Sequence, residues 1–88
     1  MLRITRQQKG GVTWLKIEGK LVGPWVEECR AACMGEASSG RSTCLDLAEI
    51  TYVDPPGAEL LEFLRRQGFR IARRSRFVAE LLKADPPA

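Results

Sequence analysis

Residues 44–57 read CLDLAEITYVDPPG, and this stretch decides the fold. Residues 43–47 form a short apolar run that predicts a buried strand. A loop follows and ends at an Asp, two prolines and a Gly, after which residues 58–67 carry the apolar spacing of a helix. Asp54 is a candidate N-cap, because its carboxylate can accept hydrogen bonds from the unpaired N–H groups of the next turn. The stretch therefore predicts a strand, a loop and a helix, with Pro55 as the first helical residue.

The segment before this stretch predicts a β-hairpin. Residues 2–8 and 12–18 both alternate, and Lys9, Gly10 and Gly11 between them form a turn in which glycine can adopt a positive φ. The second of these strands carries apolar residues on both faces, as is expected of a strand that is buried on two sides.

Two more helices and a short strand complete the predicted order, which is ββαβαβα. One helix opens at Pro24, where the missing N–H of proline costs nothing, and ends at residues 38–40. Gly68 is the expected C′ residue of the central helix, a short strand covers residues 69–72, and Ser75 caps the last helix. Strands that alternate with crossover helices favour an α/β fold with parallel strands, here opened by an antiparallel hairpin. We therefore predict a small mixed sheet with helices packed on it.

The bulk composition is that of one small domain. With 88 residues, 44% hydrophobic and 28% charged, the chain has room for a single core. We expect one domain over residues 1–88, with a frayed tail at residues 85–88. No run approaches the roughly 20 apolar residues that a membrane span needs. The first residues lack the apolar segment of a signal peptide, so a cytoplasmic location without membrane contact is expected.

Catalytic and metal chemistry have little support in the sequence. The chain has no His, the usual general base, and no phosphate-binding loop. Its three cysteines, Cys29, Cys33 and Cys44, are odd in number and lack Cys-x-x-Cys spacing. We expect reduced, buried thiols that behave as small hydrophobic residues. The sequence therefore predicts no enzyme activity, no metal and no cofactor.

The layout of residues 44–57 resembles the STAS domain, the module of bacterial anti-sigma-factor antagonists and of sulphate-transporter tails. Residues 17–21, IEGKL, resemble the second strand of that family with its Gly-x-Leu exit. Residues 68–71, GFRI, followed by Ser75, resemble its fourth strand and third helix. The resemblance covers nearly the whole chain and implies the STAS fold. Val22 departs from it, because the family often has an Asp at this position.

The resemblance gives Pro56 a particular meaning. In the family the loop usually reads Asp-x-Ser-Gly or Asp-x-Thr-Gly, and a partner kinase phosphorylates the hydroxyl residue. Pro56 holds that position and has no hydroxyl group, so phosphorylation there is chemically excluded. The resemblance therefore implies a domain that is locked in the unphosphorylated, binding-competent form. In the alternative interpretation, Asp54 is only an N-cap and the two prolines only stiffen the loop.

The leading functional hypothesis that follows is a regulatory protein-interaction domain in bacterial signal transduction and transcription regulation. The resemblance implies a partner such as an anti-sigma factor or a kinase-like protein. The predicted docking surface comprises two loops and the helix starts that follow them: Val53, Asp54, Pro55, Pro56, Gly57, Ala58 and Glu59, with Gly23, Pro24 and Trp25. Trp25 has a second interpretation as a core residue, because it falls on one helical stripe with Cys29 and Ala32.

Two alternatives from other functional classes stay open. Basic residues gather in the last quarter of the chain, and an anion-binding patch of Arg70, Arg73, Arg74 and Arg76 would bind a nucleotide or nucleic acid. Aromatic partners for base stacking are scarce near these arginines, which argues against nucleic acid. The other alternative is a structural subunit that self-associates weakly through an exposed sheet edge or helix face.

Overall fold

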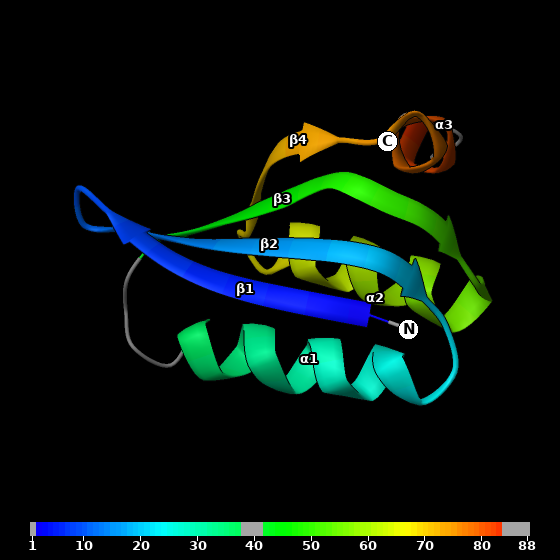
Figure 1. The fold of residues 1–88 in the computed structure, drawn as a ribbon, viewed down its shortest axis with the longest axis horizontal. Coiled ribbons are helices and arrows are strands. Elements are labelled where there is room, and N and C mark those ends of the chain that lie inside the picture. The colour runs from blue at the N-terminus through cyan, green and yellow to red at the C-terminus, as the bar shows by residue number, and fades with distance from the viewer. Residues whose placement is uncertain (1, 38–41, 84–88) are drawn as a thin grey trace.

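The structure is a computed structural model that describes residues 2–37 and 42–83. Three helices and four strands follow one another in the order ββαβαβα, which confirms the predicted order and fold class (Figure 1). The elements are β1 (Leu2–Lys9), β2 (Val12–Leu21), α1 (Pro24–Ala37), β3 (Ser42–Val53), α2 (Pro55–Arg66), β4 (Arg70–Arg74) and α3 (Arg76–Lys83). The predicted end of the first helix at residues 38–40 and the predicted tail at residues 85–88 lie outside the described residues.

The four strands form one mixed sheet in the order β1-β2-β3-β4. β1 runs antiparallel to β2, while β2, β3 and β4 run parallel to their neighbours. The hairpin turn between β1 and β2 needs glycine, because Gly10 and Gly11 both adopt positive φ angles, of 56° and 79°. The hairpin prediction is therefore confirmed, and the crossovers through α1 and α2 place the later strands in sequence order.

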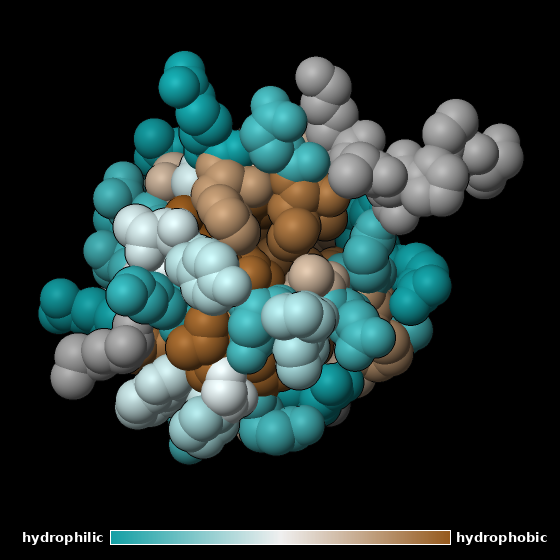
Figure 2. Space-filling view, turned by 90° about the vertical axis from the view of Figure 1, so that its right-hand side faces the viewer, coloured by the Kyte–Doolittle hydropathy of each residue, from teal (hydrophilic) through white to brown (hydrophobic). Residues whose placement is uncertain are grey.

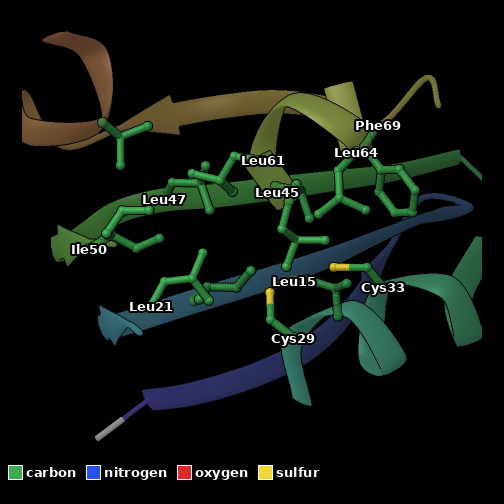
Figure 3. Close-up of a cluster of buried hydrophobic side chains, with 14 of the residues drawn as sticks. Leu15, Leu21, Cys29, Cys33, Leu45, Leu47, Ile50, Leu61, Leu64 and Phe69 are labelled. Carbon is green, nitrogen blue, oxygen red and sulfur yellow. The ribbon is translucent and has the colours of Figure 1, made fainter. Parts of the chain in front are cut away.

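One face of the sheet is covered by α1 and α2, which both lie on the same side of it (Figure 1). Leucines of β2, β3 and α2 point toward one another there, and the thiols of Cys29 and Cys33 on α1 reach into the same cluster (Figure 3). α3 lies beside β3 beyond the end of β4, and its Val78 joins the core. Burial of these apolar side chains is the main favourable term in folding.

The prediction that the strand at residues 12–18 is buried on two sides is wrong. Leu15 and Ile17 are buried, whereas Trp14 is only half-buried and Lys16 is exposed. The apolar residues of β2 suggested that its second face is buried. The neighbouring strands place polar residues on that face, such as Gln7 beside Trp14, so it stays open. We call this second face the open face. Its side chains from all four strands line a broad hollow: Arg3, Thr5, Gln7, Lys9, Trp14, Lys16, Glu18, Asp46 and Arg73.

The strand predicted at residues 43–47 is much longer, because β3 runs from Ser42 to Val53 and takes up the predicted loop before Asp54. The register between β2 and β3 shifts twice along this length. As a result Leu47, Ile50 and Val53 are all buried although they are three residues apart. A spacing of three does not match the two-residue period of a regular strand, so the sequence pattern did not show the second half of β3.

Two helix boundaries confirm the local signals read from the sequence. Gly68 follows α2 with φ of 95°, its N–H donates to the Arg65 carbonyl at 3.1 Å, and the Phe69 N–H donates to the Leu64 carbonyl at 3.1 Å. This pair of bonds is a Schellman motif, with glycine at C′ as predicted. Ser75 accepts a hydrogen bond at its Oγ from the Val78 N–H at 3.1 Å, so it caps α3.

Within residues 2–37 and 42–83, no helix combines the length and the apolar character required to cross a bilayer.

Candidate functional site

The two loops that were predicted to lie together are joined by the carboxylate of Asp54. Its Oδ1 accepts from the Gly57 N–H at 2.8 Å, which confirms Asp54 as the N-cap of α2. Its Oδ2 accepts from the Gly23 N–H at 2.9 Å, across 31 residues of sequence. The Asp54 N–H in turn donates to the Leu21 carbonyl at 3.2 Å. Asp54 thus holds the loop before α1 against the start of α2.

The first turn of α2 has no unpaired N–H group among its first four residues. Pro55 and Pro56 have no N–H to offer, and the Gly57 N–H is bonded to the Asp54 side chain. The Ala58 N–H donates to the Asp54 carbonyl at 2.8 Å. A helix start binds anions through N–H groups that point at the ligand. Those donors are absent or already engaged at the start of α2.

Gly57 is a structural requirement that sequence reasoning did not identify. A Cβ atom on this residue would lie 2.5 Å from the Leu21 carbonyl oxygen and 2.8 Å from Cγ1 of Val53. Both distances are shorter than real Cβ contacts, so only glycine lets α2 seat this closely on the ends of β2 and β3. The signal in the sequence was the Gly at the end of the Asp-Pro-Pro-Gly run, but the reason for it comes from the packing.

The ten residues of the predicted docking surface differ in exposure. The exposed ones are Gly23, Pro24, Pro55, Pro56 and Glu59, and the half-buried ones are Trp25, Asp54 and Ala58. Val53 and Gly57 are buried, so their role in this region is to shape the loop from beneath. Trp25 is thus neither fully in the core nor fully on the surface, while Val26, Cys29 and Cys33 are the buried residues of α1.

An aromatic pair at the same end of the molecule was missed by the sequence reasoning. Tyr52, near the end of β3, is 47% exposed, and its ring centroid lies 5.4 Å from that of Phe77 on α3. Figure 2 looks at the end of the molecule where β2 and β3 finish and α1 and α2 begin. Hydrophobic side chains show in a hollow at its centre, with hydrophilic ones around them. This arrangement of an apolar centre and a polar rim is typical of protein interfaces.

The arginines of the predicted anion-binding patch are divided between two elements and two faces. Arg70, Arg73, Arg74 and Arg76 are all exposed. In the register of β3 and β4, Arg73 lies beside Asp46, and its Nη1 is 3.8 Å from Asp46 Oδ2. Arg70 lies beside Cys44, which shares the open face with Trp14. The structure therefore does not gather the four arginines in one site: Arg73 alone of them lines the hollow, and Arg76 lies at the start of α3.

The cysteines are buried free thiols, and we find no metal-binding group of His, Cys, Asp and Glu among the described residues. Cys29 and Cys33 lie one turn apart on α1 and share a hydrogen bond. This bond, together with burial, raises the pKa of the Cys33 thiol above its ordinary value, so the thiol stays protonated at neutral pH. A protonated, buried thiol is a poor nucleophile and a poor metal ligand.

Comparison with protein-family models and with curated proteins gives no match. Several solved structures do match. One, described as a crystal structure analysis of Mglu, has a TM-score of 0.64 and 20% identity over 83% of this chain and 20% of that chain. Mglu in its native form gives a TM-score of 0.56 and 21% identity over 81% of this chain and 22% of that one.

A third match is an uncharacterized protein of the DUF3478 family from Shewanella loihica PV-4, described as having a SpoIIAA-like fold. It has a TM-score of 0.58 and 18% identity over 85% of this chain and 66% of that chain. The present chain therefore spans about a fifth of the Mglu chains and about two thirds of the Shewanella chain. At these identities the likeness concerns the fold alone, and the chain has the SpoIIAA-like fold that the STAS resemblance implied.

Proposed function

We propose that this chain is a non-catalytic, regulatory protein-interaction domain of the anti-sigma-factor-antagonist type. Its partner would be a regulatory protein such as an anti-sigma factor or a kinase-like protein, docked at the end of the molecule where α1 and α2 begin. The SpoIIAA-like fold supports the general class of the proposal. The observation that carries it is the construction of the α2 start around Asp54 and the two prolines.

The α2 start supports a docking surface without a phosphorylation switch. Pro56 is exposed at the second helical position. The STAS resemblance assigns the hydroxyl residue of the family's loop to this position. It has no oxygen that a kinase could phosphorylate. A phosphate brought from elsewhere would also find no free N–H in this turn, because Gly57 and Ala58 both donate to Asp54. Docking at this surface would then be constitutive.

The exposed chemistry of the surface suits docking to a flat, mostly uncharged partner region. Pro24, Pro55 and Pro56 present rigid rings, which lose little conformational freedom when a partner binds. The two charged members are Glu59, which is exposed, and Asp54, whose two oxygens already accept hydrogen bonds within the chain. Tyr52 adds an exposed aromatic side chain at the same end. Aromatic anchors of this kind often dominate the free energy of binding.

The test is direct binding of an identified partner. Partners retained from a native extract are identified by mass spectrometry, then purified and titrated by calorimetry against wild type, Pro56→Ala and Pro56→Asp. We expect Pro56→Ala to bind like wild type, and Pro56→Asp to bind at least about tenfold more weakly, as expected for an unpaired charge placed in an interface.

The matched control is Gln8→Asp, which adds the same charge to an exposed residue of β1 beside the hairpin turn. It should leave the affinity unchanged. Equal affinities for wild type and Pro56→Asp would contradict docking at this surface. Retention of nucleic acid alone, by both forms, would contradict the functional class.

A further inference from the structure

The open face of the sheet forms an ordered polar surface that the proposed docking function does not use. The strand registers place its side chains in rows that cross the sheet. One row contains Gln7, Trp14, Cys44 and Arg70, and the next contains Thr5, Lys16, Asp46 and Arg73. The row after that contains Arg3, Glu18 and Glu49, of which Arg3 and Glu18 line the broad hollow of this face. Side chains within a row are about 5 Å apart, and rows are about 7 Å apart.

These rows surround a hollow of about 620 Å³. That volume lies in the range of small-molecule sites, which is roughly 300–1,000 Å³. Apart from Trp14, every lining residue is polar or charged. A protein partner that depends on buried apolar contact would gain little here, since interface cores are rich in apolar side chains and poor in charged ones. The size and the lining both indicate a small polar ligand.

The charge of the hollow favours an anionic ligand. Four lining residues are basic, Arg3, Lys9, Lys16 and Arg73, and two are acidic, Glu18 and Asp46, which leaves a net charge of +2 (4 − 2). Asp46 is already engaged, because its Oδ1 accepts from the Ala48 N–H at 3.1 Å and its Oδ2 lies 3.8 Å from Arg73.

Arg73 keeps donors for a ligand. Its side chain is 68% exposed, and the contact with Asp46 uses one edge of a guanidinium that carries five N–H donors. A positively charged hollow with such donors attracts anionic groups and can hold a phosphate through several hydrogen bonds.

Trp14 adds a feature that inorganic anions do not require. Its half-buried side chain stands among the polar residues of the hollow, with Gln7 beside it on β1 and Lys16 two residues along β2. Aromatic side chains on an open sheet stack on nucleobases, which all have a π face. The separation of about 7 Å between Trp14 and the row of Lys16 and Arg73 suits a ligand with a base at one end and a phosphate at the other.

We propose that the open face binds a free nucleoside phosphate, with the base on Trp14 and the phosphate held by Lys16 and Arg73. Thr5 and Gln7 supply hydrogen bonds between these two ends. The site differs from the basic patch inferred from the sequence, since it uses Arg73 alone of those four arginines and depends on an aromatic residue from β2. It is independent of the docking surface, which lies at the start of the helices.

The experiment measures binding of AMP and ATP by calorimetry and by tryptophan fluorescence. The chain has two tryptophans, so a Trp25→Phe background leaves Trp14 as the only tryptophan reporter. We expect AMP and ATP to quench its fluorescence with saturation. Adenosine and inorganic phosphate each lack one half of the ligand, and each should bind at least about tenfold more weakly than AMP.

Two matched variants locate the site. Thr5→Glu adds a negative charge to the hollow, and Gln8→Glu adds the same charge to the same exposed strand outside it. Thr5→Glu should weaken ATP binding at least about tenfold, and Gln8→Glu should leave it within about twofold of wild type. Trp14→Leu should abolish adenosine binding, with thermal unfolding measured alongside because Trp14 is half-buried.

Four results would overturn the proposal. They are the absence of binding at millimolar nucleotide, equal binding of AMP and inorganic phosphate, equal loss of affinity in Thr5→Glu and Gln8→Glu, and binding of a single-stranded oligonucleotide without binding of mononucleotides.

Discussion

The two faces of the sheet are built from the same strands but differ in composition: one is apolar and covered by helices, and the other is polar and open. On β2, Leu15 and Ile17 point into the cluster under α1 and α2, while Lys16 between them points to the open face. The covered face is mostly apolar, and the sequence pattern already marked many of its residues, although not Ile50 and Val53 in the second half of β3. The open face is polar, and its character depends on which residues four strands place side by side. Stability is therefore concentrated on one face, and the other face is free to carry binding chemistry.

The largest difference between the faces should appear when neighbouring residues of β2 are truncated. Leu15→Ala removes a side chain that is 2% exposed and leaves a cavity, so it should lower the free energy of unfolding by about 2–5 kcal/mol. Lys16→Ala, on the open face, should change it by no more than about 0.5 kcal/mol. Urea denaturation measures both. A loss from Lys16→Ala as large as that from Leu15→Ala would mean that a further layer of structure covers the open face.

The helix α2 packs closely on the covered face, and this close packing requires glycine at position 57. Substitution of Gly57 tests this requirement. Gly57→Ala places a methyl group 2.5 Å from the Leu21 carbonyl oxygen, so it should destabilise the fold by about 1–3 kcal/mol through overpacking. Gly35→Ala, on α1, meets nothing within 4 Å and should stabilise by up to about 1 kcal/mol through helix propensity. Chemical denaturation measures both changes in the free energy of unfolding. If both substitutions change it in the same direction, the close contact at Gly57 does not have the effect expected here.

A smaller effect is expected at Asp54, which ties the starts of the two covering helices together. Asp54→Ala removes the cap of α2 and the acceptor of the Gly23 N–H, and should cost about 0.5–2 kcal/mol. Asp54→Asn keeps one carbonyl acceptor and should cost less. Glu59→Ala, an exposed residue in the same helix, is the control and should change stability by less than about 0.5 kcal/mol. If Asp54→Ala is equally neutral, the carboxylate does not hold the two loops together.

The sequence predicted most of the covered face and little of the open one. The helix N-caps Asp54 and Ser75 and the C′ residue Gly68 could be predicted, because their capping hydrogen bonds join residues that are close in the sequence. The bond from Gly23 to Asp54 spans 31 residues, and the row of Gln7, Trp14, Cys44 and Arg70 joins four strands.

Such long-range relations depend on strand register. The two register shifts of β3 were invisible in its residue pattern, so the length of β3 was predicted wrongly. The face of β2 that carries Trp14 was wrongly expected to be buried, because the polar residues beside it come from other strands. A sequence pattern predicts contacts between residues that are close in the sequence. It does not predict contacts that depend on which strands pair and in which register.

The smallest effect should have the opposite sign, because the covered face contains a buried polar side chain whose hydroxyl is unsatisfied. Thr13 is fully buried on β2, and within the described residues its hydroxyl has no hydrogen-bond partner. Thr13→Val keeps the shape and removes the unpaired polar group, so it should raise the free energy of unfolding by up to about 1 kcal/mol. Thr13→Ala also removes a methyl group, and the cavity should cancel the gain. A loss of stability in Thr13→Val, measured by urea denaturation, would show that the hydroxyl does find a partner. The boundary between the apolar and polar faces would then be less sharp at this end of β2 than the pairing of Leu15 and Lys16 indicates.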